Sequence, residues 1–120
     1  MKKSLDIKWR KNPSAHDYPA AEAFLSLHFE TKIARKYVRR LKSAGITRHK
    51  AIDLFRASGL PRSDESLDDD KKAIRHGKKI SPILMVRDVA HGRLIIADGY
   101  HRLCAVYAIN EDALIHCKLV

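Results

Sequence analysis

The chain has 120 residues, which is enough for one domain, and 24 Lys and Arg residues against 14 Asp and Glu residues give it a formal net charge of +10 at pH 7. Its two cysteines are too few for a disulfide-stapled secreted module, and it shows neither a signal-peptide pattern nor the ~18 consecutive apolar residues of a membrane span. We therefore expect neither secretion nor a membrane partner, but one small cytoplasmic domain whose positive charge attracts phosphate-bearing ligands such as nucleotides or nucleic acids.

The first half of the chain is predicted to form a basic arm followed by helices. Residues 1–16 carry five Lys and Arg residues but little apolar periodicity, so we expect a loosely packed arm. Apolar residues at steps of three and four predict a helix over 31–44, and a preceding helix over 17–29 has proline in its first turn. A third helix is predicted from Thr47, a suitable N-cap, to Gly59.

The second half is predicted to form a small sheet with helices. In chain order we expect a short helix capped by Ser66 and ended by Gly77, strands over 83–86 and 93–97 joined by a turn over 88–92, a helix over 99–109 and a strand over 115–119. The continuous apolar run of the first strand predicts burial on both faces, whereas we take the alternating last strand for an edge strand. The succession of strand, helix and strand predicts a crossover between parallel strands.

Together these elements predict the α+β fold class, with one domain over residues 1–120. In that domain the segment 17–64 forms a helical extension, and 67–120 forms a core with a small mixed sheet and a strand–helix–strand unit. Cys104 and Cys117 are expected to be small core residues, because the chain has no Cys-x-x-Cys or His-x-x-x-His pair. We therefore expect no metal site built from protein ligands.

The run Asp98-Gly99-Tyr100-His101-Arg102 is the most informative stretch for function. It joins the end of a buried strand to the start of a helix, where the first N–H groups have no intrahelical partner. Gly99 removes a Cβ that would keep a ligand away from the backbone, and Arg102 offers a planar fork for paired phosphate oxygens. His101 adds one or two further N–H donors. These features predict an anion site at the helix start.

Asp98 and the two basic residues each have a structural alternative. Asp98 is either the N-cap of the helix or a functional group that orients His101, holds Mg²⁺ on a nucleotide or accepts a proton from a hydroxyl. His101 and Arg102 are either solvated first-turn residues or ligands of an anion. The helix dipole disfavours cations at that position by ~0.3–1 kcal/mol each, so we favour the bound anion.

Other residues extend the candidate site. Lys50, Asp53 and Arg56 follow one side of the third predicted helix, where they form either exposed ion pairs or a second wall for phosphates. The backbone groups of Ser81 and the following proline are a further candidate for closing the same pocket.

A separate basic surface supports an alternative function. The segment 31–50 has eight Lys and Arg residues and no acidic residue, and a glycine between its helices suggests a helix-turn-helix. Its cations either solvate an amphipathic helix or contact nucleic acid through Arg35, Arg39 and Arg40. The alternative hypothesis is therefore a non-catalytic DNA- or RNA-binding module.

Two separated motifs resemble the ParB/sulfiredoxin-like superfamily. They are the helix that ends in glycine at 73–77, with the segment 80–87 that follows it, and the Asp98-Gly99-Tyr100-His101-Arg102 box, which is similar to the "DGHHR" variant of that superfamily. The resemblance implies a ParB/sulfiredoxin-like core over 67–120 and phosphate chemistry at the box. ParB proteins bind a cytidine nucleotide and sulfiredoxin uses ATP.

By position, the resemblance matches Gly99 to the box glycine and His101 and Arg102 to its two basic positions. Tyr100 stands where sulfiredoxin has its reactive cysteine, so thiol-dependent repair is not expected. Cys104 replaces a later ParB arginine, and the DNA-binding helices that follow in partition proteins are not expected here.

The predicted function is that of a nucleotide- or phosphate-binding domain, with phosphoryl transfer or nucleotide hydrolysis as its hypothetical chemistry. Asp98 and His101 are the predicted catalytic residues. Gly99, Tyr100, His101 and Arg102 are the predicted phosphate-binding residues. A nucleoside triphosphate with Mg²⁺ is the expected ligand, and the oligomeric state stays open.

Overall fold

The computed structural model describes residues 7–63 and 67–120. In chain order the elements are helices α1 (Asp17–Leu25) and α2 (Thr31–Ser43), strand β1 (Thr47–Lys50), helices α3 (Ala51–Ser58) and α4 (Asp68–Arg75), strand β2 (Ile83–Asp88), a short 3-10 helix η1 (Val89–His91), strand β3 (Arg93–Asp98), helix α5 (Tyr100–Ile109) and strand β4 (Leu114–Leu119). This mixture of helices and one sheet agrees with the predicted α+β class. No helix among these residues is long and apolar enough to cross a bilayer.

The four strands form one mixed sheet in the order β1-β4-β2-β3. The hairpin of β2 and β3 is antiparallel, β4 is parallel to β2, and β1 is antiparallel to β4. The prediction of an edge strand over 115–119 is therefore wrong, because β1 covers the other side of β4. The prediction that the strands over 93–97 and 115–119 are parallel is also wrong. β3 is antiparallel to β2, and the chain crosses over through α5 so that β4 is parallel to β2 instead.

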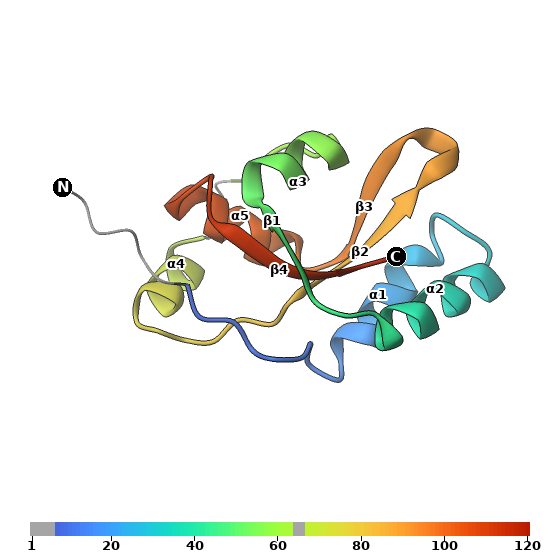
Figure 1. Ribbon diagram of the computed structural model, residues 1–120, viewed down its shortest axis with the longest axis horizontal. Coiled ribbons are helices and arrows are strands. Elements are labelled where there is room, and N and C mark those ends of the chain that lie inside the picture. The colour runs from blue at the N-terminus through green and yellow to red at the C-terminus, as the bar shows by residue number, and fades with distance from the viewer. Residues whose placement is uncertain (1–6, 64–66) are drawn as a thin grey trace.

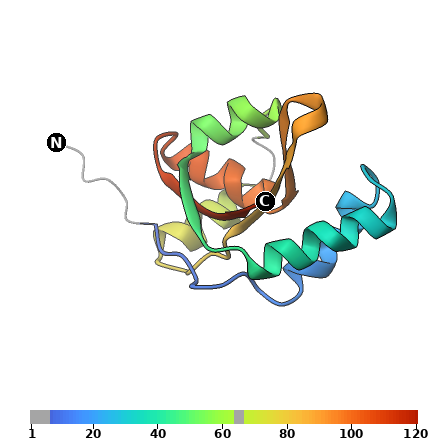
Figure 2. The same ribbon diagram turned by 45° about the vertical axis from the view of Figure 1, so that its right-hand side comes forward.

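Helices cover both faces of the sheet, as Figures 1 and 2 show for α1 and α2 on one side and α3 and α5 on the other. The side chains of β2 alternate between two hydrophobic cores, one on each face of the sheet. Ile83 and Met85 pack in a cluster that includes residues of α3, α4 and α5, whereas Leu84 and Val86 pack with residues of α1 and α2. The predicted burial of this strand on both faces is confirmed, and the two clusters join the helices to the sheet.

The third predicted helix starts too early. Residues 47–50 form β1, in which Thr47 lies opposite Cys117, and α3 begins only at Ala51. Its end at Gly59 is confirmed by a left-handed φ of 68°. The first helix is also shorter than predicted, because it ends at Leu25 rather than at residue 29. Because an extended segment and a strand follow α2, the predicted helix-turn-helix is wrong.

The helix before the hairpin is confirmed in outline. It ends as predicted at Gly77, whose φ of 84° is left-handed. The predicted cap Ser66 lies outside the described residues. The N-cap position itself is occupied by Leu67, which makes no side-chain cap hydrogen bond.

Residues 7–16, which we call the strap, are docked against the sheet. Trp9 forms a parallel bridge with Ile80, the N–H of Arg10 donates to the Ile80 carbonyl at 2.8 Å, and the N–H of Ile80 donates to the Lys8 carbonyl at 3.0 Å. The Trp9 ring stacks on His116 of β4, with ring centroids 5.1 Å apart. The prediction of a loosely packed arm is therefore wrong for these residues, and residues 1–6 lie outside the description.

The predicted extension over 17–64 is part of the same packing unit as the rest of the chain, because β1 pairs with β4 and α1 packs on β2 and β3. We expect Leu25→Ala, which truncates a fully buried side chain in the α1–α2 core, to lower the free energy of unfolding of the whole domain by ~2–5 kcal/mol in one transition. Urea melts followed by circular dichroism and by Trp9 fluorescence measure this.

Leu27→Ala is the matched control, because Leu27 follows the same helix but is 84% exposed. It should change stability by no more than ~0.5 kcal/mol. Two separate transitions in the Leu25 variant would contradict a single packing unit.

Candidate anion-binding site

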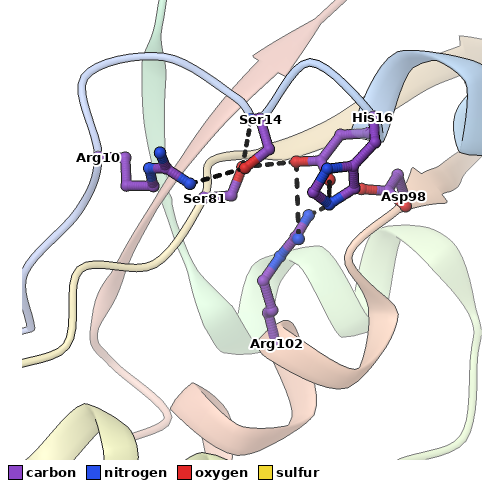
Figure 3. A network of polar contacts seen from close by, with 7 residues as sticks. Arg10, Ser14, His16, Ser81, Asp98 and Arg102 are labelled. Atoms are coloured by element: carbon purple, nitrogen blue, oxygen red, sulfur yellow. Dashed lines mark hydrogen bonds and ion pairs between the residues drawn. The ribbon is translucent and has the colours of Figure 1, made fainter.

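A buried carboxylate organises the polar side chains between the strap and the sheet (Figure 3). The side chain of Asp17, at the start of α1, is only 5% exposed. The hydroxyl of Ser81 donates to Asp17 Oδ2 at 2.5 Å, and Arg102 Nη1 lies 3.7 Å from the same oxygen. Because a buried carboxylate is tolerated only when it is paired, this contact fixes three segments of the chain relative to one another.

The strap joins this network through Ser14. Its backbone N–H donates to Ser81 Oγ at 3.0 Å, and its hydroxyl accepts from Arg10 Nη1 at 2.8 Å. His16 Nε2 lies 3.7 Å from Asp17 Oδ1. Figure 3 shows Arg10 and Ser14 approaching from the strap and Arg102 from α5. The Ser81 hydroxyl therefore both donates and accepts, and it links the strap to the buried carboxylate.

Arg102 folds back across the start of α5. Its Nη2 donates to Asp98 Oδ2 at 2.9 Å. A Cβ on Gly99 would stand 2.7 Å from Arg102 Nη2 and 3.0 Å from Ile83 Cγ1, and the φ of Gly99 is +108°. Glycine is thus favoured here by its φ, and a Cβ would also displace the end of the Arg102 side chain, so the residue serves the fold rather than the ligand that the sequence suggested.

The N-cap interpretation of Asp98 is wrong. Gly99 occupies the N-cap position of α5 without a side-chain hydrogen bond, and the Asp98 carboxylate is instead bound by Arg102. Burial raises the pKa of the Asp98 carboxyl above its usual value, and although Arg102 opposes this shift, Asp17 adds to it. Asp98 therefore takes up a proton at a higher pH than an exposed aspartate does.

A cavity of about 310 Å³ lies between the strap, the end of α4 and the start of α5. Its polar lining is mainly cationic or hydroxylic and includes Arg10, Lys78, Lys79, Arg102, Ser14 and Ser81. Among the described residues, Asp70 is the one carboxylate side chain of the lining. Asp17 and Asp98 offset the charge of Arg102, but Arg10, Lys78 and Lys79 still outnumber the carboxylate among the described lining residues. This excess of positive charge in a partly enclosed space favours an anion.

Arg102 also keeps one buried donor without a protein partner. Its Nε is buried and makes no hydrogen bond within residues 7–63 and 67–120, whereas Nη1 and Nη2 face carboxylates. Unpaired buried donors are rare in proteins. A guanidinium held by two carboxylates in this way is positioned before any ligand arrives.

The other residues of the predicted box lie away from the cavity lining. The hydroxyl of Tyr100 donates to the Pro61 carbonyl at 2.5 Å, and burial raises the pKa of this phenol, with the Cys104 thiol acting in the same direction. His101 is exposed, and its ring lies edge-on to the Tyr100 ring with centroids 5.4 Å apart. The structure thus brings Asp98 and Arg102 together but leaves His101 outside.

The predicted second wall is only partly assembled. Ser81 lines the cavity, but it closes the cavity with its hydroxyl, which donates to Asp17, and not with its backbone groups as we expected. Lys50 and Arg56 are exposed and are not part of the lining. Asp53 lines a different hollow beside the β2–β3 hairpin. The third helix therefore contributes nothing to this cavity.

Cys104 and Cys117 were predicted to be core residues rather than metal ligands. Cys104 and Cys117 are unbridged and buried, which confirms them as core residues. Within the described ranges, no group of three or more His, Cys, Asp or Glu side chains has the arrangement of a metal site.

Sequence reasoning missed most of the cavity. Arg10 and Ser14 belong to the segment that we expected to be a loose arm, and Asp17 resembles an ordinary helix-start residue. Lys78 and Lys79 offered a usable sequence pattern, because they directly follow the glycine that ends α4 and precede a buried strand.

Comparisons of the chain with known protein families, with curated proteins and with solved structures found no match. The interpretation of the cavity therefore depends on the chemistry of its own residues.

We expect Gly99→Ala to lower the free energy of unfolding by ~1–3 kcal/mol, because alanine is strained at this φ and its Cβ displaces the Arg102 side chain. Gly45→Ala is the control, since a Cβ there meets no atom within 4 Å and the residue does not have a positive φ. It should leave stability unchanged or raise it by up to ~1 kcal/mol. Equal urea midpoints for the two variants would show that Arg102 does not pack over Gly99.

Proposed function

We propose that this protein binds a phosphate-bearing ligand in the cavity between the strap and the start of α5. The observation that supports the proposal is the convergence of cations from three separate segments, namely Arg10 of the strap, Lys78 and Lys79 after α4, and Arg102 of α5. Arg102 is paired with Asp17 and Asp98, whereas Arg10, Lys78 and Lys79 have no carboxylate partner among the described residues, so a bound anion would relieve their mutual repulsion. Phosphate suits them, since Arg presents paired donors to its oxygens and Lys supplies a compact charge.

We further propose a nucleotide as the ligand, on a ParB/sulfiredoxin-like core in a cytoplasmic protein. What supports this is that the two motifs of the resemblance contribute to one cavity. The first motif, over 73–77 and 80–87, provides Ala73, Ile74, Ile80 and Ser81, with Lys78 and Lys79 lying between its two parts, and the box provides Arg102. Ser81 and Arg102 lie 21 positions apart in the sequence (102 − 81), so a shared cavity does not follow from their chain positions.

Mg²⁺ would accompany the phosphates of a nucleoside triphosphate rather than occupy a site of its own. This cation commonly binds one or two carboxylates together with substrate phosphates and water. Asp70 is the carboxylate side chain in the lining that suits this role, since Asp98 is bound by Arg102.

We propose phosphoryl transfer or nucleotide hydrolysis as the reaction that takes place in this cavity. Of the two predicted catalytic residues, Asp98 is the better supported, because it contacts a lining residue and its pKa is raised, whereas His101 is exposed. Asp17 is an additional candidate for accepting a proton, since its carboxylate already accepts the hydrogen bond of the Ser81 hydroxyl.

Replacing cavity cations tests the proposal. We expect Lys78→Ala/Lys79→Ala to weaken binding of inorganic pyrophosphate, ADP or ATP by ~10- to 100-fold in calorimetric titrations, with and without Mg²⁺, because two charge-assisted contacts are lost. Both side chains are exposed, so the fold should not depend on them. Release of phosphate from the same samples reports turnover.

The control is Lys72→Ala/Arg75→Ala, which removes two exposed cations from the neighbouring helix α4 that do not line the cavity. Its affinity should stay within about twofold of the unchanged chain. The proposal fails if the unchanged chain binds none of these ligands, or if both double variants lose the same affinity.

A further inference from the structure

A second concentration of positive charge lies on α2, outside the cavity. Its 13 residues contain six Lys and Arg residues and no Asp or Glu, so this helix alone adds +6 to the net charge of +10. These cations are Lys32, Arg35, Lys36, Arg39, Arg40 and Lys42, and all of them are exposed. None of them lines the phosphate cavity.

The packing of α2 accounts for only part of these cations, since Arg40 lies over the Tyr37 ring at 5.8 Å and Lys42 over the Tyr18 ring at 5.7 Å. The helix is held against the sheet by its buried residues Ala34, Val38 and Leu41, which pack in the core with β2, β3 and α1. Lys36 and Arg39 are three residues apart, and Lys36 and Arg40 are four apart, so like charges are neighbours on the helix surface and destabilise it. The charge therefore lowers the stability of the helix unless something outside it compensates.

A hollow at the C-terminal half of α2 collects part of this charge. It encloses about 580 Å³ and is lined by Lys36, Arg39, Arg40, Ser43, Ala44 and Val120. The polar side chains of this lining are three cations and one hydroxyl. Arg35 differs from them because its Nε has Glu22 of α1 at 4.0 Å. Figure 1 shows α2 beside α1 on one side of the sheet, and the cations of the hollow are exposed there.

We propose that this outer face of α2 binds the phosphate backbone of double-stranded DNA without sequence preference. Lys36 to Ser43 spans about 10 Å along the helix axis, over which a duplex presents about six phosphate charges. α2 has no Asn or Gln for reading adenine edges, and phosphate contacts from its Arg and Lys side chains carry no sequence information. The binding uses the side of a helix, not the helix-turn-helix that the sequence suggested.

Other anionic partners fit this face less well. Single-stranded binders combine cations with aromatic platforms. The described lining of this hollow contains no aromatic residue, and the neighbouring Tyr37 is half-buried, where it packs against Phe29 and under Arg40. Membrane-surface helices place large apolar residues beside their cations. On α2 the one large apolar residue that is exposed is Ile33, three positions before Lys36 and six before Arg39, so the cations lie beside a single apolar side chain rather than an apolar stripe.

Charge reversal on the full chain tests the proposal, with a fluorescein-labelled 20-base-pair duplex and anisotropy titrations between 50 and 200 mM KCl. We expect the unchanged chain to bind with log affinity falling by about 2.7 per decade of salt, as for three phosphate contacts. Lys36→Glu/Arg39→Glu/Arg40→Glu should weaken binding at least about tenfold at 50 mM and flatten that slope by about 2 to 3.

The matched control is Arg56→Glu/Lys72→Glu/Arg75→Glu, which changes the net charge equally at exposed cations on α3 and α4. Its affinity should fall by no more than about threefold. Circular dichroism confirms folding, and Lys36→Ala/Arg39→Ala/Arg40→Ala replaces the reversal if that variant unfolds. Lys78→Ala/Lys79→Ala should keep its duplex affinity, which separates this surface from the phosphate cavity.

Three outcomes would overturn the proposal. In the first, the unchanged chain does not bind the duplex. In the second, the reversal and its charge-matched control lose equal affinity, which would show a general charge effect. In the third, phosphatidylserine vesicles or poly-glutamate bind through these three residues while the duplex does not, which would assign the face to another class of partner.

Discussion

The buried carboxylate of Asp17 is the constraint on which the site depends. It lies between the Ser81 hydroxyl and the Arg102 guanidinium, and it can stay buried only while both partners are in place. Asp17 lies at the start of α1, Ser81 just before β2 and Arg102 at the start of α5, so one carboxylate aligns three segments. The backbone N–H of Ser14 donates to the Ser81 hydroxyl, which joins the strap to these three segments. The cavity lies between the segments that are aligned in this way.

The local patterns predicted most of the helices and strands but not how the strands pair. The helix over 31–44, the hairpin of β2 and β3 and the ends at Gly59 and Gly77 follow from side-chain periodicity and from glycine, which act within a few residues. The strand β1 has only four residues and is stabilised by pairing with β4, about 70 residues later. Such long-range pairing overrides local propensity, which also explains why β4 is central in the sheet.

The sequence located two residues of the cavity lining. Arg102 was predicted from the Asp98–Arg102 box, and Ser81 was predicted as a residue that closes the pocket beside that box. Lys78 and Lys79 follow a glycine that the sequence marks as the end of a helix. Arg10 and Ser14 instead depend on the docking of the strap, whose Trp9 stacks on a histidine more than 100 residues away. Composition and periodicity carry no information about such a contact. Gly99 shows the same limit, because the approach of the Arg102 side chain adds to the preference for glycine that its φ already sets.

Hydrogen exchange at three backbone amides tests the docked strap most directly. The N–H groups of Arg10, Ser14 and Ile80 donate to the Ile80 carbonyl, the Ser81 hydroxyl and the Lys8 carbonyl. In NMR measurements on the full chain, we predict that all three exchange far more slowly than in an unstructured peptide, and more slowly again with inorganic pyrophosphate. Exchange at unprotected rates, both without and with pyrophosphate, would contradict a strap that helps to form the cavity.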